Sequence, residues 1–270
     1  MRSPLLSRRA RLWYAGVAVL TAVFALIPPL SSQIRHYESF EALQFSIFAI
    51  VVPALLAIGA PWWLFGLASP PGAEGAATAH RRSLDRLADS RRRHPEFIRA
   101  LGFLLVDLVV VVGWRMPDTV NAVAAHRWLV APEALTLTVA GIGLWLELVE
   151  SPPSSPRLAR PWRAVVASLA MWTTWSVAYF VALSNTIWYR SYHHVAGHGL
   201  SANADQQFSS VVLWMVAALA FLPVVFWNLV YWLKSEDDPD EELQALVRRE
   251  RRHAWATPPP LGRDEGPPPG

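Results

Sequence analysis

The chain has 270 residues and a formal net charge of +3; hydrophobic residues make up 53% of it and charged residues 17%. Soluble domains carry about 25% charged residues, so this composition argues against an ordinary soluble domain and favours a lipid-embedded one. The absence of Cys excludes disulfides, thiolate metal sites and a Cys nucleophile. Most Lys and Arg residues flank apolar runs, where membrane topology explains them, so nucleic acid is not a predicted partner.

Six apolar segments are long enough to cross a lipid bilayer, which takes about 20 residues. Helices are expected, because hydrocarbon offers the backbone no hydrogen-bond partners. In chain order the segments are 12–30, 42–68, 97–116, 129–149, 164–186 and 208–233. The sequence therefore predicts an all-α fold, a polytopic membrane bundle of six transmembrane helices.

The first segment also has one feature of a signal peptide, because three arginines precede it. Its apolar run is longer than the usual 7–15 residues, however, and no A-x-A cleavage site follows it. We therefore expect an uncleaved helix.

The distribution of basic residues predicts the orientation. Of the 24 Lys and Arg residues, only Arg35, Arg115, Arg127 and Arg190 fall in the connections on the side opposite the termini. Cytoplasmic loops carry the excess of Lys and Arg, so both termini are expected in the cytoplasm, with the protein in a bacterial inner membrane.

The predicted domain organisation has three parts: a basic tail (1–11), the six-helix domain (12–233) and a cytoplasmic C-terminal part (234–270). In the last part, Asp238 and Pro239 are typical of a helix start, and the Pro-rich end is expected to be disordered. The Arg-rich connection 69–96 is interpreted either as a basic helix on anionic headgroups or as a solvated linker.

Five of the eight histidines lie in the predicted outer connections, and they form the first candidate functional site. They are His36, His126, His193, His194 and His198. Because imidazole is a common ligand of copper and zinc, His193, His194 and His198 form a candidate metal site. The alternative is ordinary loop histidines.

Charged residues inside the spans are the second candidate. Asp107 is the deepest, and a charge there costs about 2.5–3.5 kcal/mol on insertion scales. It is interpreted as a proton or cation site of a transporter, or as a hydrogen-bonded packing residue. Arg115 and Glu133 lie near the outer surface and form a hypothetical pair between the third and fourth spans.

Four stretches carry a resemblance to a known family: ALLAIGAPWW (54–63), GWRMP (113–117), EALTLTVAGIGLW (133–145) and DQQFSSVVLW (205–214). Together they resemble the CtaG-type cytochrome c oxidase assembly factors, over residues 12–234. The matching residues are Gln44, Gly59, Pro61, Trp114, Pro117, Glu133, Asp205, Gln206, Gln207 and Trp214. The chain has no P-loop, G-x-S-x-G, H-E-x-x-H or Rossmann motif, and the family is not one of enzymes.

The resemblance implies a role in maturing the copper centre of a haem–copper oxidase, with copper as the candidate ligand. It implies oxidase subunits or other assembly factors as partners. The positions at which the family carries intramembrane His are occupied here by Glu41, Phe45, Arg115, Val130 and Ala134. Either the outer histidines replace those ligands, or this chain keeps the scaffold without the metal.

Two alternative functions stay open from the sequence. One is a metal-free structural or accessory subunit of a respiratory complex. The other is a small solute or ion transporter that uses Asp107.

Overall fold

The computed structural model describes residues 7–28, 30–62, 96–151, 156, 158–184, 186–193 and 200–236. The chain divides into two units, 1–229 and 230–270. The predicted basic helix within 69–96, the C-terminal helix and tail beyond 236, and His194 and His198 lie outside the described residues.

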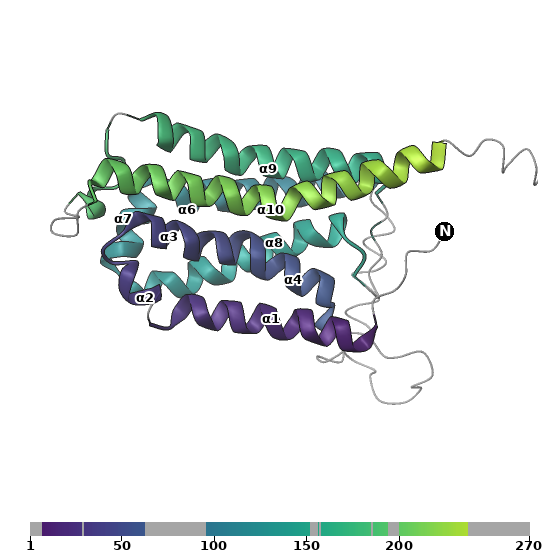
Figure 1. Ribbon diagram of the computed structural model, residues 1–270, viewed down its shortest axis with the longest axis horizontal. Coiled ribbons are helices and arrows are strands. Elements are labelled where there is room, and N and C mark those ends of the chain that lie inside the picture. Colours follow the sequence, from purple (N-terminus) through teal and green to yellow (C-terminus); the bar gives the residue numbers. More distant parts are fainter. Residues whose placement is uncertain are drawn as a thin grey trace, which may run out of the picture. The chain divides into compact units, whose positions relative to one another are not determined.

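The predicted all-α bundle is confirmed, because six helices are long and apolar enough to cross a membrane and the described residues form no strand. The elements are α1 (Arg8–Leu26), α2 (Leu30–Gln33), α3 (Glu38–Ser46), the π-helical turn η1 (Ile47–Val51), α4 (Val52–Gly59), α6 (Glu96–Arg115), α7 (Pro117–Ala125), the 3₁₀ turn η3 (Arg127–Leu129), α8 (Val130–Leu148), α9 (Arg160–Leu183), the 3₁₀ turn η4 (Arg190–Tyr192) and α10 (Ala202–Glu236). The long helices run side by side, and α2 and α7 lie at one end of them (Figure 1).

Helix boundaries differ from the predicted ones where local capping decides them. The first helix begins at Arg8, inside the segment predicted as a tail, because the Ser7 hydroxyl accepts a hydrogen bond from the Ala10 amide at 3.2 Å. The second ends at Gly59 instead of continuing to 68. Ala60 after it has a left-handed backbone with φ of 44°, which stops a helix.

Small residues let α1 and α4 approach closely. Ala15, Ala18 and Ala25 are buried on α1. A Cβ atom on Gly59 would lie 2.8 Å from the backbone nitrogen of Ala15. Such a contact requires backbone movement, so Gly59 permits the helix crossing.

Replacing Gly59 with Val is therefore expected to lower the free energy of unfolding by about 1–3 kcal/mol, the usual range for overpacking. Thermal unfolding of the protein in detergent, followed by intrinsic fluorescence, measures the effect. The matched control is Gly16→Val on α1, because a Cβ there meets nothing within 4 Å. Equal unfolding temperatures for the two variants would contradict the close approach.

A break in the second span brings it against α8. Pro53 has no amide proton for the Ala49 carbonyl, and the π-helical turn precedes it. A Cβ atom on Gly141 of α8 would lie 2.6 Å from Cγ of Pro53 and 2.8 Å from the Ala49 oxygen. The Thr138 hydroxyl donates to the Phe48 carbonyl at 3.4 Å. The helix irregularity is thus covered by a glycine and a hydroxyl of the neighbouring helix.

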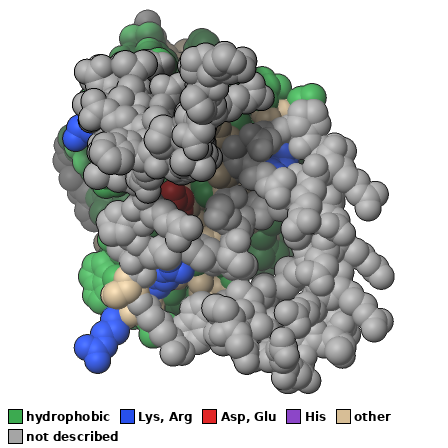
Figure 2. All heavy atoms as spheres, turned by 90° about the vertical axis from the view of Figure 1, so that its right-hand side faces the viewer, with side chains coloured by type: hydrophobic (Ala, Val, Ile, Leu, Met, Phe, Trp, Pro, Cys, Tyr) green, Lys and Arg blue, Asp and Glu red, His purple; other side chains and the backbone are tan. Residues whose placement is uncertain are grey.

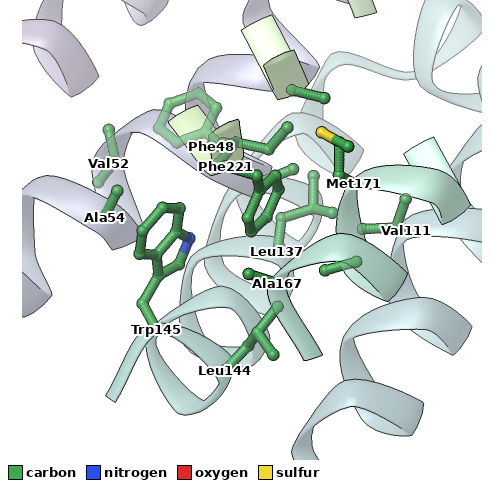
Figure 3. Close-up of a cluster of buried hydrophobic side chains, with 14 of the residues drawn as sticks. Phe48, Val52, Ala54, Val111, Leu137, Leu144, Trp145, Ala167, Met171 and Phe221 are labelled. Atoms are coloured by element: carbon green, nitrogen blue, oxygen red, sulfur yellow. The ribbon is translucent and has the colours of Figure 1, made fainter. Parts of the chain in front are cut away.

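The hydrophobic core joins the long helices at mid-length. Trp145 of α8 stacks on Phe221 of α10, with ring centroids 5.1 Å apart and 14° between the ring planes (Figure 3). The surrounding core side chains labelled in Figure 3 include Phe48, Val52, Val111, Leu137, Leu144, Ala167 and Met171. Helices from all parts of the first unit therefore share one core.

One buried ion pair lies at the end of the bundle where α1 begins. Arg99 of α6 binds the carboxylate of Glu147 of α8 with Nε at 3.0 Å and Nη2 at 2.7 Å, and Glu147 is fully buried. Figure 2 views the surface at this end, where the described side chains that can be seen are mostly hydrophobic, basic or uncharged and, in one place, acidic. Glu147 lies beneath this surface, because it is fully buried. A bidentate pair of this kind fixes the register of α6 against α8.

Candidate functional site: a buried polar centre

Five charged side chains are buried together where α6 ends and α3, α8 and α10 begin. We call this set the polar centre: Glu38, Glu41, Arg115, Glu133 and Asp205. It holds four carboxyl groups and one guanidinium, so carboxyl groups outnumber the basic group. Buried charges persist only when they are paired and hydrogen-bonded. Some of the polar atoms in the polar centre meet this condition and others do not.

The first turns of α3 supply one wall of the polar centre. Glu38, Glu41 and Phe45 follow one another at spacings of three and four residues, which places them on one helix face. All three are buried.

Arg115, the last residue of α6, is the cation of the centre. Its Nη1 forms an ion pair with the Glu41 carboxylate. The guanidinium carbon lies 5.2 Å from the ring centroids of both Phe45 and Tyr189, a cation–π arrangement on two rings. Arg115 is only 3% exposed, so this is a desolvated pair rather than a surface one.

Tyr189 supports the same residue from the connection before α10. Its hydroxyl donates to the Arg115 carbonyl at 3.1 Å. Burial raises the pKa of Tyr189 to about 12, so the hydroxyl keeps the proton for this bond at neutral pH. Tyr192 lies beside it, and burial raises the pKa of Tyr192 as well.

Hydrogen bonding in the centre is incomplete among the described residues. The Nε and Nη2 atoms of Arg115 are buried without a partner, and so is one carboxylate oxygen of Glu38. The other Glu38 oxygen accepts a hydrogen bond from the Ser209 hydroxyl at 2.5 Å. Within the polar centre, Arg115 therefore binds Glu41, and Ser209 of α10 binds Glu38.

Asp205 caps α3 from a different helix. Its carboxylate accepts hydrogen bonds from the Glu38 amide at 2.6 Å, the Ser39 amide at 3.2 Å and the Ser39 hydroxyl at 2.6 Å. The first amides of a helix have no partner within it, and an anion there also interacts favourably with the helix dipole. Asp205 therefore fixes the start of the second span against the start of the last.

Gln206 ties the connection before α10 to the end of α9. Its amide nitrogen donates to the carbonyls of Val181 at 3.0 Å and Thr186 at 3.2 Å, and its oxygen accepts from the Trp188 amide at 2.9 Å. Gln207 is exposed. In the DQQ stretch, Asp205 therefore caps α3 and Gln206 binds the end of α9. Gln207 makes neither contact.

The other motif residues are spread over the bundle. Gln44 donates to the Ala25 carbonyl at 2.6 Å, and Trp114 donates to the Thr136 hydroxyl at 2.9 Å. Pro117 opens α7, Gly59 and Pro61 lie at the opposite end, and Trp214 is partly exposed. These residues join neighbouring elements and do not converge on one point.

The pairing of Arg115 with Glu133 differs from the sequence hypothesis. Arg115 pairs with Glu41 of the second span, because α3 brings that carboxylate onto the guanidinium. Glu133 is buried within electrostatic range of both residues. Arg115 is the last residue of α6 and is itself buried within the protein.

Two residues that the sequence marked as candidates for chemistry, Asp107 and His193, do not belong to the polar centre. Asp107 is buried on the inward face of α6, two turns from Arg115. His193 is exposed after η4. Within the described part of the chain, no group of three or more His, Cys, Asp or Glu side chains is arranged to hold a metal ion.

Sequence reasoning missed Glu38, Ser39 and Ser209. The signal for Glu38 was present, because Glu38, Glu41 and Phe45 share a helical face. The signals for Ser39 and Ser209 were not, because each depends on a partner more than 160 residues away.

The family model described as cytochrome c oxidase caa3 assembly factor (Caa3_CtaG) matches residues 2–235. The chain belongs to this assembly factor family. The resemblance drawn from the four sequence stretches is thereby confirmed. No curated protein and no solved structure matches the chain. Membership in the assembly factor family implies interaction with cytochrome c oxidase components.

The residues at the family's His positions do not fit copper. Glu41 and Phe45 both contact Arg115, as positions of one site should. A phenyl ring has no donor atom, however, and a guanidinium repels a cation. The carboxylate that remains is occupied by Arg115.

Proposed function

We propose that this chain assists the assembly of a haem–copper cytochrome c oxidase through contacts with oxidase subunits or other assembly factors, without holding copper in the polar centre and without enzymatic activity. Family membership supports the oxidase role. The single observation that carries the metal-free form is the Arg115 guanidinium, inserted between Glu41, Phe45 and Tyr189.

In this proposal the guanidinium provides the positive charge that holds the carboxylates together. It binds α3 to the end of α6, and Tyr189 links both to the connection before α10. Asp205 and Ser209 then join α10 to α3. A rigid set of helix ends results, and it suits a scaffold that presents a fixed surface to a partner.

The test combines a gene deletion with a copper titration. Deletion is expected to lower the amount of assembled oxidase, measured by its haem spectrum and activity in membranes. Purified protein is expected to bind no stoichiometric copper at the polar centre. A full complement of active oxidase without the gene would overturn the assembly role.

The outer histidines provide the control for copper. Copper binding that disappears when His193, His194 and His198 are changed to Ala would assign the metal to the outer connection. Stoichiometric binding that survives this change and is lost in Glu41→Gln would contradict the metal-free polar centre.

The alternatives make different predictions. A permanent accessory subunit would copurify with mature, active oxidase, whereas an assembly factor is expected only with incomplete oxidase. A transporter would give flux in liposomes that is lost in Asp107→Asn. Among the described residues, Asp107 has no hydrogen-bond or ion-pair partner, and no such bond joins it to the polar centre.

We also propose a bacterial inner membrane location with both termini in the cytoplasm. The described arginines at the starts of α1 and α9, Arg9, Arg11, Arg160 and Arg163, support this orientation. Alkaline phosphatase fused after His193 should be active, and the same reporter fused after Gly270 should be inactive. The reverse pattern would contradict the orientation.

A further inference from the structure

One exposed surface of the bundle differs in chemistry from the exposed surfaces at the middle of α6 and α8. It lies where α9 packs beside α10, and we call it the tryptophan face. It consists of Trp172, Trp175, Ser176 and Tyr179 of α9 and Trp214 of α10. By contrast, the exposed large side chains in the middle of α6 and α8 are all aliphatic: Leu101, Leu105, Val106, Val109, Leu135 and Val139.

The three tryptophans form a fixed array. The rings of Trp172 and Trp175 meet edge to face, with centroids 5.4 Å apart. Trp175 stacks on Trp214 at 5.3 Å, and its indole nitrogen donates to the Trp214 carbonyl at 3.1 Å. A preformed aromatic surface loses little conformational freedom when something binds to it.

The array is too deep for an interfacial aromatic belt. Trp172 lies twelve residues after the start of the 24-residue α9, which is about 18 Å along the axis at 1.5 Å per residue. It is therefore near the middle of the span, whereas interfacial tryptophans gather at the two membrane surfaces.

Trp172 also carries a hydrogen-bond donor with no acceptor. Its side chain is 55% exposed, and among the described residues nothing accepts from its indole nitrogen. The neighbouring hydroxyls of Thr173 and Ser176 turn back to the carbonyls of Leu169 and Trp172, at 2.9 and 2.8 Å. Lipid tails offer no acceptor, so whatever covers Trp172 at this depth must supply one.

We propose that the tryptophan face binds a transmembrane helix of a cytochrome c oxidase component and that this helix presents a hydrogen-bond acceptor to the Trp172 indole. The inference rests on the proposed function for the choice of partner. Trp and Tyr dominate the energetic centres of protein interfaces. Hydroxyl-bearing and small side chains such as Ser176 let membrane helices approach and bond to one another.

The test uses a photoreactive amino acid in the full-length chain, expressed in cells that assemble the oxidase. Placed at Ser176, beside Trp172, it is expected to crosslink to an oxidase subunit identified by mass spectrometry. Placed at Val139, which is 60% exposed on the aliphatic surface, it is expected to give no such product. Equal crosslinking at the two positions would overturn the proposal, as would products of Ser176 with lipid or with a second copy of this chain alone.

A second variant isolates the hydrogen bond. Trp172→Phe keeps the aromatic ring but removes the N–H group, and a lost hydrogen bond of about 1 kcal/mol corresponds to about a fivefold weaker association. The crosslink from position 176 should fall by that factor. An unchanged yield would overturn the acceptor that the proposal assigns to the partner helix.

The two proposals fail in distinguishable ways. Reduced oxidase content after gene deletion, together with no oxidase crosslink from position 176, overturns the docking surface and leaves the assembly role standing. Normal oxidase content after deletion overturns both.

Discussion

Changing Arg115 to Met is expected to lower the free energy of unfolding by about 3–5 kcal/mol, the usual cost of removing one partner of a buried ion pair. The loss has two causes. The Glu41 carboxylate would remain buried without its cation, and Glu38 and Glu133 would lose their electrostatic attraction to Arg115. Thermal or denaturant unfolding in detergent, followed by fluorescence, measures the change.

Two further variants test this explanation. The double change Glu41→Leu with Arg115→Met removes both charges of the pair and is expected to recover part of the loss, because paired replacement of buried charges by apolar groups is often close to neutral. Arg127→Met is the control on an exposed arginine and should shift stability by no more than about 0.5 kcal/mol. Identical unfolding of Arg115→Met and Arg127→Met would refute the role of the ion pair.

Changing Asp205 to Ala is expected to cost about 3 kcal/mol, because it removes the acceptor of three hydrogen bonds and leaves buried amides unpaired. Asp205→Asn keeps one acceptor oxygen and should lie between the wild type and the alanine variant. Unfolding in detergent measures both. Hydrogen exchange of the Glu38 and Ser39 amides should rise in the same order.

The neighbouring Gln207 provides the matched control. It belongs to the same sequence stretch but is exposed, so Gln207→Ala should change stability by no more than about 0.5 kcal/mol. If Asp205→Ala and Gln207→Ala behaved alike, capping of α3 by α10 would be wrong.

The fold was predictable because its main signal is local. A run of about 20 apolar residues is readable without knowledge of any neighbour, and all six spans were found. Their ends were less predictable. The cap at Ser7 and the left-handed residue Ala60 decide two of them. Serine is a favoured N-cap residue, but alanine rarely adopts a left-handed backbone, so the end at Ala60 had no signal in the sequence.

The polar centre was predictable only in part, because its contacts join distant residues. The DQQ stretch marked Asp205 and Gln206 as residues of interest, yet their partners lie on α3 and at the end of α9. Arg115 and Glu41 are 74 residues apart. Only helix packing decides between Glu41 and Glu133, which are chemically equivalent candidates in the sequence.

The cap that Asp205 places on α3 also sets an order for biogenesis. Glu38 leaves the ribosome 167 residues before Asp205, so the second span enters the membrane with the amides at its start unpaired. They acquire their acceptor only after the final span has been synthesised and inserted. A chain that stops before α10 therefore keeps the first amides of α3 and the Glu38 carboxylate without the partners that α10 supplies.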